Sequence, residues 1–429
     1  MSAPIETRIN AVDFIPFARP FIGREEEEAA IRVLRSGWLT TGKEALAFEK
    51  EFEAYLSVAG LRALAVNSAT SGLHLAMEAC GVGSGDVVIT SPYTFTSTAE
   101  VARYLGADVA FVDVSPDSYL IDPAALERTV ERLAAGLPAY PPRDDASRQE
   151  REAGGFGPRG RPAVIAPVHV GGLPCDMDAI LAVARRHGIR VVEDAAHAFP
   201  SRFDDGRYAG TLGDVGVFSF YATKTITTGE GGMIVTADDK LAARIAVMRS
   251  HGIDRSVWNR YTDRKASWRY AVVEAGYKYN LPDILAAVGR VQLSRADYLL
   301  SARRDIAQRY DEAFRADDRF LLPPTGPADA RHLYPLRLTS GRLRRDEFIE
   351  ALQERGIGVS VHFIPLHTMP YYADRYGLRP DDFPAALASF EASISLPLWP
   401  GMSEVQVERV ITAVRDTADG EAGGRGTGR

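Results

Sequence analysis

The sequence predicts an α/β fold in which a doubly wound, mostly parallel sheet is followed by a smaller α+β domain. Up to about residue 250, short runs rich in β-branched residues alternate with segments of helical length. Most of these runs lack polar alternation, which is typical of strands that helices cover on both faces. Past residue 260 the alternation stops, so a second domain of different architecture is expected there.

Seven strands are expected in the first part of the chain, because seven short apolar runs are bounded there by turn residues or helical segments. They are 63–67 (ALAVN), 87–91 (VVITS), 109–113 (VAFVD), 163–168 (AVIAPV), 189–193 (IRVVE), 215–220 (VGVFSF) and 232–236 (GMIVT). The clearest helical segments between them are 71–81, 95–105, 122–136 and 177–187.

The second part begins with one long helical stretch from Asp283 to about Phe314. It follows Pro282, and proline is favoured at helix starts. The other elements expected here are strand-like segments 332–338 and 357–363 and helices 345–355, 383–391 and 403–417. Strands and helices that are segregated in this way are typical of an α+β domain.

We therefore expect a large α/β domain over 1–260 and a small α+β domain over 261–416. Residues 137–162 are rich in proline, glycine and charge, so they are expected to form a surface insertion between two strands. Residues 417–429 are glycine-rich and are expected to form a disordered tail.

The composition bounds the class of protein. With 429 residues the chain exceeds one ordinary domain, and 46% apolar and 25% charged residues are typical of a soluble globular protein. A net charge of −7 argues against non-specific nucleic-acid binding. Cys80 and Cys175 are expected to be free thiols, which fits a reducing cytoplasm. We find no signal peptide and no apolar run near 18 residues, so no membrane association is expected.

No metal site is expected, because the eight histidines are scattered and form no cluster with cysteine. Ligands of open α/β sheets bind beyond the carboxyl ends of the strands, and three such ends carry unusual residues. The first is NSATSGLHLA, 67–76, where small hydroxyl residues open a helix directly after a strand. Free amides and the helix dipole suit a phosphate there, and an ordinary helix cap by Ser68 or Thr70 is the alternative.

The second strand end is IRVVEDAAHAF, 189–199, where Asp194 follows an apolar strand. A carboxylate in such a place faces a cation or a ring N–H, or else caps the next helix. The third is SFYATKTITTGEGGM, 219–233, which contains Lys224 with no acid within five residues. Desolvation lowers the pKa of such an amine and makes it a nucleophile, whereas a loop lysine at the surface is the plain alternative.

Together a phosphate seat, an aspartate and a lysine are the parts of a pyridoxal phosphate site. The cofactor needs an amine with which its aldehyde forms an imine. It also needs a carboxylate that keeps the pyridine nitrogen protonated, so that the ring accepts electrons. An amine with this task should have no salt-bridge partner, which explains the isolation of Lys224.

The chain resembles the pyridoxal-phosphate-dependent nucleotide-sugar aminotransferases of the DegT/StrS family over nearly its whole length. The resemblance implies an enzyme of the aspartate aminotransferase fold type, with a seven-stranded sheet in a large domain that binds the cofactor. The motifs that carry it are SGWLTTG, NSATSGLHLA, SPYTFTST, HVGGLPCDM, VVEDAAHA, GVFSFYATKTITTGEGG and GYKYNLPDILAAVG.

By this resemblance Lys224 forms the internal aldimine and shuttles the proton between the substrate carbon and C4′ of the cofactor, and Asp194 pairs with the pyridine N–H. His197, where many relatives have glutamine, reaches the phenolic oxygen or the ring edge. Phe95 stacks on the ring. The resemblance also implies a homodimer with shared sites. The implied phosphate contacts are Thr70, Ser71, Ser219 and, from the neighbouring subunit, Asn280.

The implied reaction has two halves. Glutamate leaves its amine on the cofactor to give the pyridoxamine form, and that amine then passes to a keto-sugar attached to a nucleotide. The GWLTTG motif resembles relatives that act on a 4-keto sugar, and an NDP-4-keto-6-deoxy sugar is expected. Trp38, Thr40 and Thr41 are expected near the sugar. Further substrate-side candidates, for which structural roles stay open, are His169, Lys278, His332 and His362.

Three alternatives remain open at this point. The amine could enter at C3 of the sugar. A different reaction on the same cofactor is possible in this family, although Lys224 argues against the dehydratase relatives that have histidine there. A non-catalytic regulatory protein that kept the fold is the third, and the intact lysine, aspartate and phosphate seat argue against it.

Overall fold

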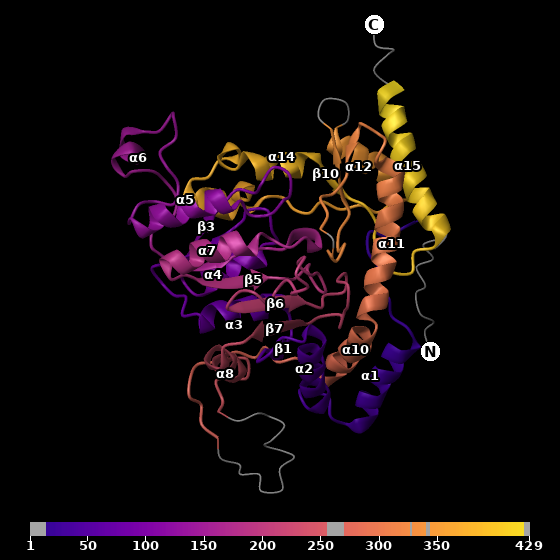
Figure 1. Ribbon diagram of the computed structural model, residues 1–429, viewed down its shortest axis with the longest axis horizontal. Helices are drawn as coiled ribbons and strands as arrows, with labels where there is room; N and C mark the ends of the chain where they lie inside the picture. Colours follow the sequence, from indigo (N-terminus) through magenta and orange to yellow (C-terminus); the bar gives the residue numbers. More distant parts are fainter. Residues whose placement is uncertain (1–13, 255–269, 327, 340–343, 424–429) are drawn as a thin grey trace, which may run out of the picture.

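The computed structural model describes residues 14–254, 270–326, 328–339 and 344–423. These residues form a seven-stranded sheet and a three-stranded sheet, with helices packed around both (Figure 1). The predicted fold class, α/β with a second α+β part, is confirmed. The predicted division of the chain at residue 260 lies outside the described residues and stays a prediction. None of the described helices is long and apolar enough to cross a membrane.

The large sheet contains the seven strands that the sequence predicts. Its spatial order is β1-β7-β6-β5-β4-β2-β3. The strands from β2 to β6 pair in parallel, whereas β7 is antiparallel to both β1 and β6. Their bounds are β1 Arg62–Val66, β2 Asp86–Thr90, β3 Asp108–Phe111, β4 Arg161–Ala166, β5 Arg190–Asp194, β6 Val215–Ser219 and β7 Gly232–Thr236.

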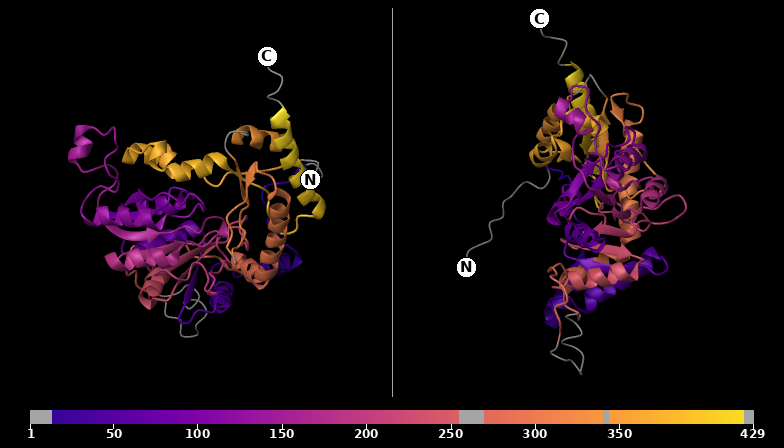
Figure 2. Two further views of the ribbon diagram at one scale, coloured as in Figure 1. Left: turned by 45° about the horizontal axis from the view of Figure 1, so that its top comes forward. Right: turned by 90° about the vertical axis from the view of Figure 1, so that its left-hand side faces the viewer.

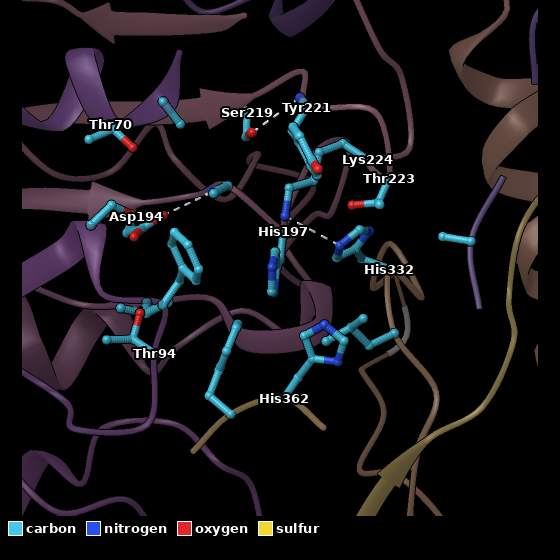
Figure 3. A pocket seen from close by; sticks show the side chains of 18 of the residues that line it. Thr70, Thr94, Asp194, His197, Ser219, Tyr221, Thr223, Lys224, His332 and His362 are labelled. Atoms are coloured by element: carbon cyan, nitrogen blue, oxygen red, sulfur yellow. Dashed lines mark hydrogen bonds between the residues drawn. The ribbon is translucent and has the colours of Figure 1, made fainter. Parts of the chain in front are cut away.

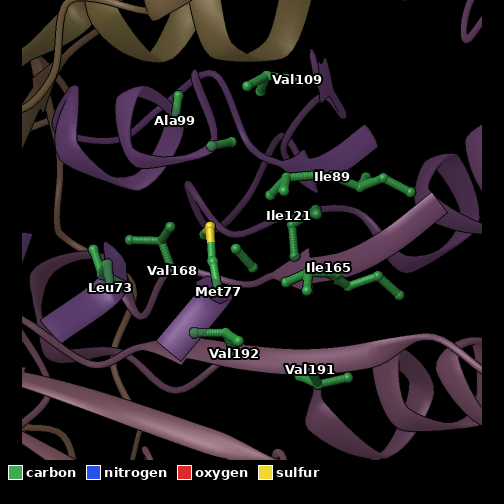
Figure 4. Close-up of a cluster of buried hydrophobic side chains, with 14 of the residues drawn as sticks. Leu73, Met77, Ile89, Ala99, Val109, Ile121, Ile165, Val168, Val191 and Val192 are labelled. Atoms are coloured by element: carbon green, nitrogen blue, oxygen red, sulfur yellow. The ribbon is translucent and has the colours of Figure 1, made fainter. Parts of the chain in front are cut away.

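Helices cover both faces of this sheet, and alternate residues of its strands therefore enter two different apolar cores. In β1, for example, Leu64 and Val66 join one core, whereas Ala63 and Ala65 join the other. Figure 4 shows part of the first core, in which Met77 lies among side chains of several strands. The helices of this part are α1 Arg24–Ser36, α2 Lys43–Leu56, α3 Ala69–Ala79, α4 Ser97–Tyr104, α5 Pro123–Ala134, α6 Arg148–Glu152, α7 Met177–His187 and α8 Asp239–Met248.

The long helical stretch expected after Pro282 is two helices, α10 (Asp283–Ser294) and α11 (Ala296–Phe314). They meet at Arg295, which forms ion pairs with Glu25 and Glu26 of α1. Helix α10 packs against α1 and α2, and α11 continues from α10 toward the small sheet and packs against α15 (Figure 2). The break therefore follows from contacts with the start of the chain.

The small sheet is antiparallel in the order β10-β9-β8 and has its own apolar core. The strand-like segment 357–363 does not form a strand, because it pairs at two isolated points with different partners, Ile15 and Ser395. The bounds in this part are β8 Phe320–Leu321, β9 Pro335–Leu338, α12 Arg345–Glu354, α13 Pro370–Tyr376, α14 Pro384–Ala392, β10 Ser393–Ser395 and α15 Glu404–Gly423.

The predicted tail at 417–429 begins too early. Helix α15 continues to Gly423, and Thr417 and Ala418 are 2% and 0% exposed. Ala418 belongs to the core of the small sheet, to which α15 contributes residues at helical spacing. Residues 424–429 lie outside the described residues.

The segment 137–162 contains α6 and is tied to the large sheet. Tyr140 is 8% exposed, and its hydroxyl accepts a hydrogen bond from the N–H of Phe111 in β3. Arg143 lies over the ring of Phe156 and forms an ion pair with Asp382. The segment is therefore ordered by contacts at both its start and its middle.

Candidate active site

A cavity of about 570 Å³ lies at the carboxyl ends of β1, β5 and β6, where the sequence analysis expects a ligand (Figure 3). Its lining includes the start of α3, the ends of β5 and β6, the turn that carries Lys224, and three segments from the C-terminal part of the chain. Of the residues predicted to bind cofactor or substrate, those that line it are Thr70, Phe95, Asp194, His197, Ser219, Lys224, His332 and His362.

The first turn of α3 forms a seat for an anion. Ser68 caps the helix by accepting a hydrogen bond from the N–H of Ser71 at 3.1 Å. In the described part of the chain, the N–H groups of Ala69 and Thr70 have no partner, so they remain available at the positive end of the helix. A side chain at Gly232 would lie 2.8 Å from the nitrogen of Ala69, which shows how closely β7 supports this turn.

Ser71 does not line the cavity. It is 9% exposed, and its hydroxyl donates to the side-chain oxygen of Asn67 at 2.6 Å. Its part is to shape the turn, whereas Thr70 and Ser219 present hydroxyl groups to the cavity. The hydroxyl of Ser71 is thus engaged by Asn67, and the predicted contact of this residue with a phosphate stays a prediction.

Asp194 ends β5 and is 4% exposed. Its Oδ2 accepts a hydrogen bond from the hydroxyl of Thr98 at 2.6 Å, and its Oδ1 accepts one from the N–H of Ala196 at 3.1 Å. Burial raises the pKa of this carboxyl, and these hydrogen bonds and the charge of Lys224 oppose the rise. A buried carboxylate that faces a cavity and has spare acceptor capacity suits a cationic ring N–H.

Lys224 lies in the turn after β6 and is partly buried at the cavity wall. Among the described residues no carboxylate lies within ion-pair distance of its Nζ, which contacts Nε2 of His332 at 3.5 Å. Burial lowers the pKa of Lys224 to about 7; Arg303 adds to this, and Asp194 opposes it. A substantial fraction of the amine is therefore neutral near pH 7 and able to act as a nucleophile.

The cavity histidines are neutral imidazoles. The N–H of Gly171 donates to Nδ1 of His197 at 3.3 Å, so the proton of this neutral ring is on Nε2. Burial and the charge of Lys224 hold the pKa of His197 and of His332 well below the usual range. The two rings lie 4.4 Å apart between centroids, and burial lowers the pKa of His362 to about 4.

His169 does not contact the cavity, so its predicted contact with substrate is wrong for this chain. The ring is 0% exposed, and its Nε2 donates to Oε2 of Glu193 at 2.9 Å. The N–H of Cys175 donates to Nδ1 at 3.0 Å, which leaves no free polar atom. Because Glu193 precedes Asp194 on β5, the two carboxylates point in opposite directions from the strand.

The other five predicted site residues lie together elsewhere, beside the start of α2 and α10. The hydroxyl of Thr41 donates to the carbonyl of Leu281 at 2.5 Å and accepts from the side chain of Asn280. Asn280 also accepts from Lys278. None of this group lines the cavity of its own chain. The group, called here the Asn280 cluster, consists of Trp38, Thr40, Thr41, Lys278 and Asn280.

Some residues of the site were not expected from the sequence. Thr98 does not line the cavity but supports Asp194 from behind; it lies within the SPYTFTST motif, so its hydroxyl could have been considered as a partner of that carboxylate. Phe17 and Ser360 come from segments far apart in the chain and carry no local signal of a site. The remaining unexpected lining residues are Ala18, Ser68, Ala69, Thr94, Ser97, Val168, Ala196, Tyr221, Thr223, Glu230, Gly231, Leu333, Phe363 and Leu398.

Comparison with known proteins agrees with this site. Residues 20–415 match the model of the DegT/DnrJ/EryC1/StrS aminotransferase family. The spore coat polysaccharide biosynthesis protein SpsC of Bacillus subtilis is 43% identical over 413 residues, which are 95% of this chain and 98% of SpsC.

Solved structures show the same fold. Spr1654 from Streptococcus pneumoniae, in its PMP form, superimposes with a TM-score of 0.82 at 30% identity, over 95% of this chain and 100% of that one. The same protein has also been solved in a PLP form. Helicobacter pylori PseC, an aminotransferase involved in the biosynthesis of pseudoaminic acid, gives a TM-score of 0.81 at 26% identity, over 95% and 100% of the two chains.

Proposed function

The chain belongs to the DegT/DnrJ/EryC1/StrS aminotransferase family, and from that premise we propose that it transfers an amino group from glutamate to a keto-sugar linked to a nucleotide. Family and structural relatives make it a pyridoxal-phosphate-dependent sugar aminotransferase. The acceptor that we propose is an NDP-4-keto-6-deoxy sugar. The observation that carries the proposal is the amine of Lys224, which has no acid partner among the described residues and shares a cavity with the buried carboxylate of Asp194.

The residues of the cavity fit the cofactor. When bound, pyridoxal phosphate supplies an aldehyde for amines and a ring that withdraws electrons from the carbon that loses a proton. The free N–H groups of Ala69 and Thr70, with the hydroxyls of Thr70 and Ser219, would hold the phosphate. Asp194 would hold the ring N–H, and Thr98 fixes its carboxylate. Phe95, 60% exposed on the cavity wall, is free to stack on a ring.

Lys224 is the base and acid of the proposed reaction. Its Nζ takes a proton from the substrate carbon and returns one, which requires a pKa near the working pH. The lowered pKa of about 7 meets that requirement. His332 accepts a hydrogen bond from the protonated amine, and its own low pKa keeps it from competing for the proton.

The C-terminal wall of the cavity is the proposed sugar side. His332, Ser360 and His362 present polar groups there, and Leu398 presents apolar surface; Phe17, from the start of the chain, stacks on His362 and adds to it. A sugar ring with hydroxyl groups and one methyl group uses both kinds of contact. The roles of SpsC in spore coat polysaccharide biosynthesis and of PseC in pseudoaminic acid biosynthesis support a sugar substrate.

We also propose a homodimer in which the Asn280 cluster completes the cavity of the partner. The cluster carries hydrogen-bonding groups but does not line its own cavity. Next to it, α1, α2 and their connection expose apolar side chains, namely Ile31, Leu34, Leu39 and Leu46 at 41%, 53%, 48% and 38%. Exposed apolar surface of this kind is typical of a subunit interface. Two free cysteines support a cytoplasmic location.

The function is tested by supplying the holoenzyme with glutamate and a panel of nucleotide-linked 3-keto and 4-keto sugars. Mass spectrometry of the products should detect an amino sugar from a 4-keto-6-deoxy substrate, and Lys224→Ala should form none. Amine that appears only on 3-keto substrates would overturn the proposed regiochemistry. Protein that holds the cofactor but aminates no sugar in the panel would contradict the proposed substrate class.

A further inference from the structure

Arg303 is a buried arginine that reaches the back of the cavity. It lies on α11 and is 2% exposed. Its Nη1 donates to the carbonyl of Leu398 at 2.9 Å and to the carbonyl of His332 at 3.3 Å. Its Nη2 donates to the carbonyl of Thr223 at 3.2 Å. One guanidinium thus joins three separate segments of the main chain.

In the part of the chain that the structure describes, no acid neutralises this guanidinium. Among the described residues, no carboxylate lies within ion-pair distance of Arg303, and its Nε has no hydrogen-bond partner. Burial lowers its pKa to about 10, so the side chain remains charged at neutral pH. A buried charge without a counter-charge is destabilising and is uncommon in proteins. Arg309, on the same helix, shows the ordinary arrangement, with an ion pair to Glu408.

The three carbonyls belong to the active site. Thr223 immediately precedes Lys224, and His332 contacts the amine of Lys224 through its ring. Leu398 lines the cavity on the proposed sugar side. Figure 3 shows Thr223, Lys224 and His332 next to one another. The guanidinium therefore lies behind the residues that place the amine.

Among the described residues, the acids that line the cavity of Lys224 are Asp194 and Glu230, and Glu230 is exposed. Asp194 lies on one side and favours the protonated amine, whereas Arg303 favours the neutral one. The three histidines of the cavity, His197, His332 and His362, are uncharged at neutral pH. Arg303 is thus the fixed cation that opposes Asp194 in the described part of the chain.

We propose that Arg303 is a positioning residue for amino transfer: its uncompensated charge keeps the Lys224 amine neutral, and its three hydrogen bonds hold the lysine turn against the His332 and Leu398 segments. The inference rests on the proposed function, because it assigns to Lys224 the task of a neutral nucleophile. A purely structural arginine would need the hydrogen bonds but would not need to stay unpaired.

The test measures the protonation of Lys224 directly. The full chain, freed of cofactor, is labelled with acetic anhydride at a series of pH values, and mass spectrometry gives the labelling midpoint of Lys224. Exposed Lys240 serves as the internal reference. In Arg303→Met and Arg303→Gln the midpoint should move upward by about one pH unit, the scale of one neighbouring charge. Arg303→Lys keeps the charge and should restore most of the wild-type midpoint.

Arg304→Met is the matched control. Arg304 follows Arg303 on α11 and also donates to a main-chain carbonyl, that of Asp329, without contact with the lysine turn. In Arg304→Met the labelling midpoint of Lys224 should equal that of wild type. If circular dichroism shows that Arg303→Met and Arg303→Gln are folded and the labelling midpoint of Lys224 is unchanged in them, the inference is overturned. If wild-type Lys224 labels at the same pH as Lys240, the premise that burial keeps this amine neutral is wrong, whereas the proposed function fails only if the holoenzyme aminates no sugar.

Discussion

Nε2 of His332 lies 3.5 Å from Nζ of Lys224, and these two nitrogens come from different parts of the fold. Lys224 follows β6 of the large sheet, whereas His332 precedes β9 of the small one. The contact therefore makes the position of the amine depend on how the two sheets are packed.

Removal of this contact should slow amino transfer. His332→Leu leaves the amine without its acceptor, and the loss of one hydrogen bond of this kind is expected to lower kcat about 10-fold. His332→Asn retains a polar side chain and should lose less. Steady-state kinetics with glutamate would measure both, and equal rates in His332→Leu and wild type would show that the contact has no part in the reaction.

The lysine should also make the cofactor-free protein less stable in acid. Its pKa is about 7 in the folded state and 10.5 unfolded, so below pH 7 folding buries a charged amine. As pH rises from 7 to 10.5 the folded state loses this proton while the unfolded state keeps it, and stability increases. Lys224→Met should therefore be more stable than wild type at pH 6, by about 1–3 kcal/mol.

The difference between Lys224→Met and wild type should shrink between pH 7 and pH 10.5. Urea unfolding at several pH values measures it, and Lys240→Met controls for the loss of an ordinary surface lysine. A difference that is constant with pH would mean that burial does not lower the pKa of Lys224.

Loss of the Asp194 carboxylate should lower activity and cofactor binding more than loss of the hydroxyl that holds it. Asp194→Ala removes the acceptor for the ring N–H and should lower kcat by at least about 100-fold, the usual effect of a lost charge in a preorganised site. Thr98→Val removes only the 2.6 Å hydrogen bond to Oδ2 and should have a smaller effect, about 10-fold. Equilibrium dialysis of the cofactor provides a second measurement. An effect of Thr98→Val as large as that of Asp194→Ala would contradict this order.

Glu193, next to Asp194, should matter for stability instead. It is 0% exposed and accepts hydrogen bonds from His169 and from the N–H groups of Gly210, Leu212 and Gly213. Although its burial alone would raise the pKa of Glu193, these contacts lower it. Glu193→Gln replaces an acceptor with a donor facing N–H groups, which should destabilise the fold by roughly 3 kcal/mol.

Chemical unfolding would measure the effect of Glu193→Gln, with Glu350→Gln on the exposed face of α12 as the control. Glu193→Gln protein that remains folded should keep the wild-type preference among sugar substrates. A change in that preference would place Glu193 in contact with the site and contradict the structural assignment.

A shared active site can be tested by mixing subunits. Lys224→Ala and Asn280→Ala should each be inactive as homodimers, because every site lacks one residue. After equal mixing about half of the dimers are hybrids. In each hybrid one of the two sites combines an intact Lys224 with an intact Asn280 from the other chain, so about one quarter of the wild-type activity should return. No recovery, with subunit exchange proven by mass spectrometry, would argue that each chain forms its site alone.

The sequence was most informative where burial sets the pattern. The strands of the large sheet could be predicted because each is a short apolar run buried on both faces, and their shared carboxyl edge brought Asp194 and Lys224 to one cavity. The end of α10 could not be predicted, since Arg295 meets Glu25 and Glu26 only after folding.

The errors at the site have the same origin. His169 is of a residue type that is common in active sites, and only its buried contacts with Glu193 and Cys175 show that it is structural. Arg303 resembles any other arginine of a polar helix, because nothing near it in sequence shows that it will lack an acid. A local pattern reports which atoms are present, whereas their pairing depends on segments far along the chain.

The pairing of β1 has a consequence for synthesis on the ribosome. This strand lies at the edge of the large sheet, where β7 is its neighbouring strand, through contacts such as that of Ala63 with Val235; its last residue, Val66, also bridges to Asn280. The emerging chain must therefore extend beyond Thr236 before its first strand has a neighbour, which takes on the order of 10–30 s at usual rates of translation. During that interval Leu64 and Val66 are exposed to the cell, and protection of a nascent apolar segment by a chaperone would act at this point.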